Sequence, residues 1–299
     1  MGYLFLTFAL AAGITKAYCG KKTSTYTADL KDAMLANSIR MLFCICIGFV
    51  LILLQGELGF MKPSLSLLLI TAFSGISTAV FVVTWLLSVK KGAYMMVEVF
   101  VMLGVLLPMS LGGILFQESI RLTAWIGMAV LTAATLIMYS YNSTQKQKLT
   151  KTALLLLLLC GMASGLADFS QKLFVRTLPE IPASVFNFYT YVFSALVLVP
   201  SFLLICKKNA PGASLKNNPI FSKIFGYILV MSVCLFLNSY FKTKAAVHLD
   251  SAQLYPLNQG CALILSTFMS ALLFKERITL RCAIGLLLAF AGLILINVL

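Results

Sequence analysis

The chain has 299 residues, of which 61% are hydrophobic and only 11% charged, and its mean hydropathy is +0.98. A soluble domain carries roughly 45–50% apolar and about 25% charged residues, so this composition excludes a soluble protein. The net charge of +14 does not indicate a nucleic-acid partner, because most Lys and Arg residues lie in short loops between long apolar segments. We therefore expect an all-α, multi-pass integral protein of the cell membrane.

Apolar segments of about 20 residues, the length that crosses the hydrocarbon core as a helix, follow one another along the chain. Helices suit this environment because they satisfy their own backbone hydrogen bonds, which lipid cannot do. The remaining loops leave no room for a soluble catalytic domain. We predict ten transmembrane helices, at residues 2–19, 34–54, 65–88, 92–116, 122–141, 152–174, 184–206, 222–241, 250–274 and 279–299.

One pattern occurs twice, first at Leu115–Met138 and again at Leu273–Ile296. Each copy contains the end of an apolar helix, a short charged turn and a second apolar helix. The positions shared at a constant offset of 158 include Leu115/Leu273, Phe116/Phe274, Glu118/Glu276, Ile120/Ile278 and Gly127/Gly285. Because Glu118 and Glu276 each precede a helix, where a carboxylate suits the helix N-terminus, we expect both to cap the helix that follows.

The first spans of the two halves also correspond, at an offset of 152. Ala9 and Gly13 lie over Gly161 and Gly165, and small residues four apart allow helices to pack closely in lipid. An odd number of spans per repeat makes the second half enter the membrane from the opposite side. We predict two inverted five-helix repeats, at 1–141 and 152–299, joined by a polar linker at 142–151.

Several of these features together resemble the EamA-like form of the drug/metabolite transporter superfamily. They are the five-plus-five plan, the Glu-containing turns Gln117-Glu118-Ser119 and Lys275-Glu276-Arg277, the glycines of the last helices, and Pro108 in the fourth span. The resemblance covers essentially the whole chain, although the Trp-Gly pair common in the family's first span is absent. It implies cytoplasmic termini, whereas the excess of basic residues in the odd-numbered loops predicts termini outside. The orientation stays open.

Ionisable residues inside spans cost at least about 2.5 kcal/mol at mid-membrane, so they are rare and usually functional. We expect two clusters near opposite faces, one with Lys16, Arg40 and Glu98, the other with Asp168 and Lys172, where Lys242 and Lys244 end the eighth span. Structural ion pairs, helix-to-helix hydrogen bonds and interfacial anchoring are the alternatives. The candidate substrate-binding residues are Lys16, Asn37, Arg40, Trp85, Glu98, Asp168, Asn187, Tyr191, Asn238, Gln253 and Asn258.

These features favour a secondary active transporter that moves a small polar metabolite, with a carboxylate, phosphate or zwitterionic amino-acid-like head, by alternating access. Lys16 and Arg40 would face the anion, and Glu98 or Asp168 would carry a coupling proton or face an ammonium. Efflux of lipophilic cations and a non-transporting scaffold remain open alternatives. We expect no enzyme activity, because an enzyme would need a paired nucleophile and base, and the only His, His248, lies at the edge of a loop. We also expect no cofactor and no metal, lipid as the surrounding partner, and either a monomer or a homodimer.

Overall fold

The computed structural model describes residues 1–27, 29–91, 94–118, 120–142, 151–208, 224–274 and 280–297. The part of the chain it describes is helical and contains no strand. The elements are α1 (Gly2–Ser24), α2 (Leu30–Gln55), the short 3-10 helix η1 (Glu57–Met61), α3 (Leu65–Lys91), α4 (Tyr94–Gly104), α5 (Leu106–Phe116), α6 (Leu122–Asn142), α7 (Lys151–Thr177), α8 (Ala183–Lys208), α10 (Phe225–His248), α11 (Ser251–Phe274) and α12 (Leu280–Asn297).

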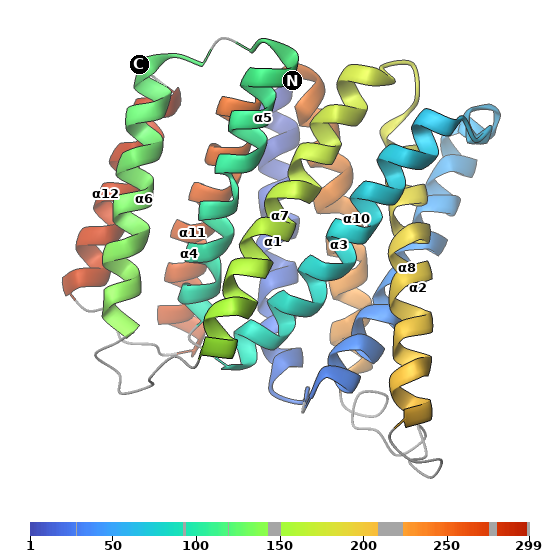
Figure 1. Ribbon diagram of the computed structural model, residues 1–299, viewed down its shortest axis with the longest axis horizontal. Coiled ribbons are helices and arrows are strands. Elements are labelled where there is room, and N and C mark those ends of the chain that lie inside the picture. Colours follow the sequence, from blue (N-terminus) through green and yellow to red (C-terminus); the bar gives the residue numbers. More distant parts are fainter. Residues whose placement is uncertain are drawn as a thin grey trace.

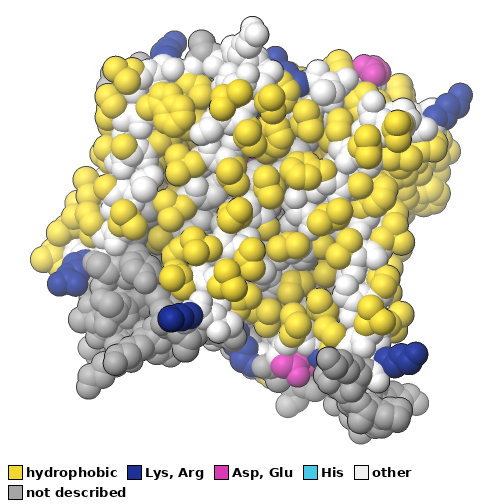
Figure 2. Space-filling view, in the orientation of Figure 1, with side chains coloured by type: hydrophobic (Ala, Val, Ile, Leu, Met, Phe, Trp, Pro, Cys, Tyr) yellow, Lys and Arg dark blue, Asp and Glu magenta, His cyan; other side chains and the backbone are white. Residues whose placement is uncertain are grey.

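The surface confirms a membrane protein with the ten predicted spans. Among the described residues, eight helical segments are long and apolar enough to cross a membrane, and shorter apolar helices at Leu122–Ala134 and Ala283–Ile296 supply the other two. Figure 2 shows hydrophobic side chains over the middle of the visible face, with Lys, Arg, Asp and Glu at its edges. Such a belt matches a hydrocarbon core bounded by polar interfaces.

The fourth predicted span, 92–116, is divided at Val105 into α4 and α5. Pro108 explains the division, because proline lacks a backbone N–H and its ring clashes with the carbonyl four residues earlier. That carbonyl belongs to Gly104, the last residue of α4. The predicted span itself is confirmed, because Val97–Phe116 is long and apolar enough to cross a membrane, and the structure adds the division within it.

The two halves pack as inverted repeats. α1 packs on α10 and α3 packs on α7, two contacts that interchange when the halves are exchanged, while α2 packs on α8 and α6 packs on α12. In Figure 1, α1 descends from the N-terminus whereas α7 ascends, so the equivalent helices run in opposite directions. The fold therefore confirms two inverted five-helix repeats. The bounds of the halves, 1–141 and 152–299, and the linker at 142–151 stay predictions, because residues 143–150 lie outside the described ranges.

Glycines bring α4 and α7 into direct backbone contact. A Cβ on Gly161 would lie 2.2 Å from the carbonyl oxygen of Phe100, and one on Gly165 would lie 2.1 Å from that of Gly104. No side chain fits at either distance, so the two backbones touch. Since lipid provides little hydrophobic force between helices, such close packing is what holds them together. The small-residue pattern predicted close packing at Gly161 and Gly165, and the structure identifies α4 as the partner.

We expect Gly165→Ala to destabilise the bundle, because its methyl group would collide with backbone that cannot move aside. Overpacking of this kind costs on the order of 1–3 kcal/mol. The measurement is the melting temperature of the purified protein in detergent. Gly226→Ala is the matched control, because a Cβ there meets nothing within 4 Å. A Gly165→Ala variant that melts at or above the wild-type temperature would contradict the contact.

Candidate functional site

A cavity lies between the two halves, roughly midway along the helices. It encloses about 930 Å³ of empty space, including its open mouth, and receives side chains from α1, α3, α4, α7, α8, α10 and α11. Seven of the predicted substrate-binding residues line it: Lys16, Trp85, Glu98, Asp168, Tyr191, Asn238 and Asn258. The midplane position between inverted repeats is where transporters of this architecture hold their solutes.

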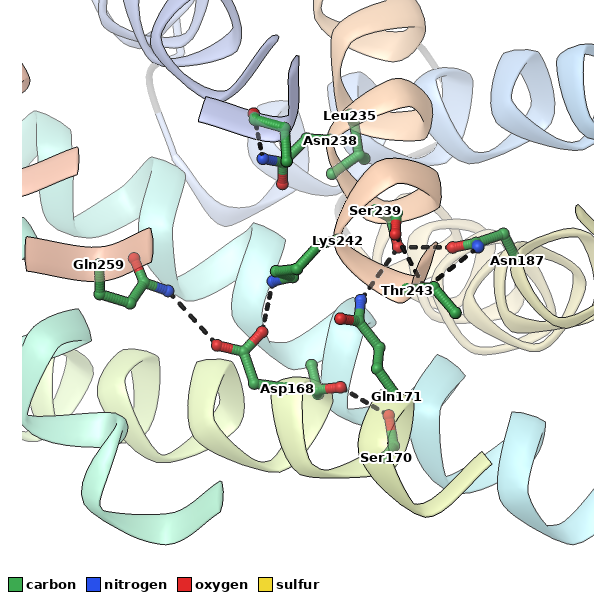
Figure 3. Close-up of polar contacts among 12 residues, drawn as sticks. Asp168, Ser170, Gln171, Asn187, Leu235, Asn238, Ser239, Lys242, Thr243 and Gln259 are labelled. Atoms are coloured by element: carbon green, nitrogen blue, oxygen red, sulfur yellow. Dashed lines mark hydrogen bonds and ion pairs between the residues drawn. The ribbon is translucent and has the colours of Figure 1, made fainter. Parts of the chain in front are cut away.

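An ion pair between the second-half helices forms one wall of the cavity. Lys242 Nζ on α10 donates to Asp168 Oδ1 on α7, and Gln259 Nε2 on α11 donates to Asp168 Oδ2 at 3.4 Å (Figure 3). The side chains of Asp168 and Lys242 are only 3% and 10% exposed. Lys242 was expected on the same side as Asp168 but not among the candidate binding residues, because the predicted span ended at residue 241. The helix α10 instead continues to His248 and carries Lys242 inside the bundle.

The charges of the two halves share this cavity, so the expectation of two separate clusters is wrong. Lys16 on α1 and Glu98 on α4 line the same space as Asp168 and Lys242. Glu98 Oε1 accepts a hydrogen bond from Trp85 Nε1 at 3.3 Å. Lys16 makes no hydrogen bond or ion pair with any residue that the structure describes, although all four charges lie close enough to interact electrostatically.

Some cavity residues also form hydrogen bonds between helices, which is the alternative role given above for the polar residues of the spans. Asn238 Nδ2 donates to the Ala9 carbonyl at 2.7 Å, which joins α10 to α1. The Tyr191 hydroxyl donates to the Leu235 carbonyl at 3.2 Å, which joins α8 to α10. These side chains therefore fix the walls of the cavity as well as facing it.

Four candidates do not line the cavity: Asn37, Arg40, Asn187 and Gln253. Arg40 lies behind it, in a smaller hollow that Lys16 also reaches, and donates to Asn37 Oδ1 at 2.5 Å. Asn37 in turn donates to backbone carbonyls of α2 and α3. Asn187 is linked to the cavity through Ser239, a lining residue whose hydroxyl donates to Asn187 Oδ1 at 2.5 Å. The sequence identified the polar faces of these helices, but neighbouring helices cover them.

A second ionic cluster joins the halves at the end of the bundle where α5 and α7 finish. The buried carboxylate of Glu118 accepts hydrogen bonds from Lys172 Nζ and Arg176 Nη2, each at 2.9 Å, and from the backbone N–H of Ser251 at 2.8 Å. Ser251 begins α11, so Glu118 caps a helix of the opposite half, whereas we expected it to cap α6. Its counterpart Glu276 lies outside the described residues.

Burial alone would raise the pKa of Glu118, but hydrogen bonds from Lys172, Arg176 and the Ser251 amide hold it below the ordinary value of 4.5. The carboxylate is therefore ionised at neutral pH. The ionised Glu118 carboxylate stabilises the folded protein fully at a pH above its ordinary pKa of 4.5. This stabilisation is lost as the pH falls through the lower pKa that Glu118 has in the folded protein.

Inverted halves around a buried, charged cavity are typical of membrane transporters. A family model agrees: the EamA-like transporter family matches residues 151–298. Among curated proteins, quaternary ammonium compound-resistance protein QacH of Staphylococcus saprophyticus is 34% identical over 85 residues, which are 28% of this chain and 78% of that protein. The corresponding match to QacC of Staphylococcus aureus is 32% identical over 89 residues, 29% of this chain and 79% of QacC. The chain belongs to the EamA-like family of the drug/metabolite transporter superfamily.

A solved crystal structure shows the same fold. It superposes with a TM-score of 0.74, covers 99% of this chain and 96% of its own, and is 13% identical in sequence. At this identity the likeness supports the architecture alone.

We expect Glu118→Gln to lower the melting temperature at neutral pH, because hydrogen bonds to a charged partner contribute about 1.5–3 kcal/mol each. The melting temperature of the variant should also fall less than that of the wild type when the pH is lowered towards 4. Thermal melts between pH 4 and 8 would measure both effects. Glu180→Gln, which changes an exposed carboxylate between α7 and α8, serves as the control. If the melting temperatures of wild type and Glu118→Gln depend on pH in the same way, the ionised Glu118 does not stabilise the contact between the halves.

Proposed function

We propose that the protein is a secondary transporter that moves a small polar solute with an anionic group, zwitterions included, by alternating access between its two halves. The cavity between the repeats supports this, since it is large, carries charged and polar side chains and receives them from both halves. No ATP-binding motif of the G-x-x-x-x-G-K-[ST] type occurs in the sequence, which favours secondary over ATP-driven transport.

The observation that carries the proposal is the state of Lys16. Asp168 is already engaged by Lys242, whereas Lys16 has no ion-pair partner within the described ranges. A lysine at this depth is costly unless something compensates its charge. A carboxylate or phosphate of the solute would do so, and Arg40, behind Lys16, adds positive potential to the same side.

Alternating access is supported by the contacts between the halves. The Glu118 cluster ties the first half to Lys172 and Ser251 of the second half at one end of the bundle. Such a tie must break if the halves are to rock and open the cavity towards that end. Glu98 or Asp168, both carboxylates of the cavity, is the proposed carrier of a coupling proton.

Transport of lipophilic cations is the second candidate, and the names of QacH and QacC favour it. Phe81, Trp85 and Tyr191 give the cavity an aromatic side, on which a cation could rest near Glu98. Lys16 opposes this candidate, because its ammonium would repel a permanent cation in a medium of low dielectric constant.

Lys16→Met separates the two candidates. We expect amino acids and phosphate esters, but not quaternary amines, to raise the melting temperature of the wild type in detergent. The variant should bind the anionic and zwitterionic compounds on the order of tenfold or more weakly, because a charge-assisted hydrogen bond is lost. Uptake of the best ligand into proteoliposomes should fall in parallel.

The control is Lys62→Met, the same change at an exposed lysine after η1. Stabilisation by quaternary amines alone, strengthened by Lys16→Met, would establish the cation candidate in place of the proposal. A wild-type protein that moves no solute from a broad panel would revive the scaffold alternative.

A further inference from the structure

A chain of side-chain hydrogen bonds runs from α8 through α10 to the cavity. It begins at Asn187, whose amide Nδ2 donates to the Ala183 carbonyl at 2.7 Å. That bond fixes the orientation of the amide and leaves Asn187 Oδ1 as an acceptor, which receives the hydroxyl of Ser239 at 2.5 Å. The side chains lie in this sequence in Figure 3.

The single hydroxyl proton of Ser239 is thereby used, so its oxygen can only accept the next bond. The donor is Gln171 Nε2 on α7, at 3.2 Å. Gln171 must therefore turn its amino group towards Ser239 and its oxygen, Oε1, the other way. In Figure 3 this oxygen points to the side of the Asp168–Lys242 pair.

Gln171 Oε1 is buried but receives no hydrogen bond from any described residue. The side chain lines the cavity, and the residue is only 6% exposed. A buried acceptor without a donor costs about 1–3 kcal/mol, so such atoms are rare unless a ligand or water satisfies them. The nearby ammonium of Lys242 donates to Asp168 and makes no hydrogen bond to this oxygen. A second buried acceptor without a donor in the described part of the chain, Asn258 Oδ1, lines the same cavity.

We infer that Gln171 Oε1 accepts a hydrogen bond from an N–H group of the solute, so that the transporter selects primary amines with an anionic group over their quaternary analogues. The inference rests on the proposed function, in which Lys16 binds the anionic group. A quaternary ammonium has no N–H to donate and would leave Gln171 Oε1 unsatisfied. Ser239 and Asn187 are positioning residues, since they act by holding the Gln171 amide in one orientation.

Two matched pairs of probes test this selectivity: alanine and phenylalanine, each against its N,N,N-trimethyl derivative. Both members of a pair carry the same charges and differ in the N–H groups and the size of the head. We expect the wild-type protein in detergent, followed by thermal shift or calorimetry, to bind a primary amine on the order of tenfold more tightly than its trimethyl partner.

Gln171→Met removes the acceptor at nearly constant volume, and should weaken binding of the primary amine about tenfold while leaving the trimethyl compound unchanged. Ser239→Ala keeps Gln171 but frees its amide to rotate, so the preference should shrink, and Ser239→Thr should restore it. Ser232→Ala is the matched control, because this buried hydroxyl of α10 donates within its own helix, to the Ile228 carbonyl at 2.8 Å.

Equal binding of both members of each pair by the wild type, or equal weakening of both by Gln171→Met, would overturn the inference and leave the proposed function standing. If Ser239→Ala keeps the selectivity, Ser239 does not position Gln171 and the inferred fixed acceptor is wrong. This variant also tests the inference if Gln171→Met does not fold. If neither zwitterion of either pair binds the wild type, the proposed function fails, and the inference fails with it.

Discussion

Lipid neither donates hydrogen bonds nor drives helices together, and this constraint governs every contact of the molecule. Helices can associate only where their surfaces fit closely, so the backbone contact of Gly161 and Gly165 with α4 is a requirement of the fold. The break at Val105 belongs to the same contact. Pro108 ends the hydrogen-bond ladder at Gly104, and the carbonyl of Gly104 is the group that faces Gly165.

The same constraint makes unpaired polar groups informative. Asp168 with Lys242, and Glu118 with Lys172, are buried pairs that compensate each other. Within each pair the opposite charges offset each other, so neither pair leaves an unmatched charge for a solute. Lys16 and Gln171 Oε1 differ, because neither has a partner among the described residues and both face the cavity. The proposals for function depend on these two groups.

The sequence predicted what depends on local chemistry and missed what depends on packing. Hydropathy identified all ten spans, and the repeat at Leu115–Met138 and Leu273–Ile296 indicated inverted halves. Lys242 was treated as the end of a span because hydropathy falls there, although the helix continues to His248. Gln171 carried no signal of its own, since its orientation is set by Ser239 on another helix. Likewise, no local pattern could show that Glu118 caps a helix of the other half.

The repeat also explains why the two sides of the cavity carry different polar groups. Lys16 and Asp168 occupy corresponding positions in the two halves, 152 residues apart, and both side chains reach the same space. A duplicated scaffold brings equivalent positions together at the pseudo-twofold axis, but here the two residues have opposite charge. Lys242 engages Asp168. Within the described chain, the first half contributes the Lys16 ammonium, which has no hydrogen bond or ion pair, and the second half contributes the Gln171 oxygen, which has no donor. The two halves have the same fold but present different polar groups to the cavity. This arrangement suits a solute with an anionic group at one end, facing α1, and an N–H group at the other, facing α7.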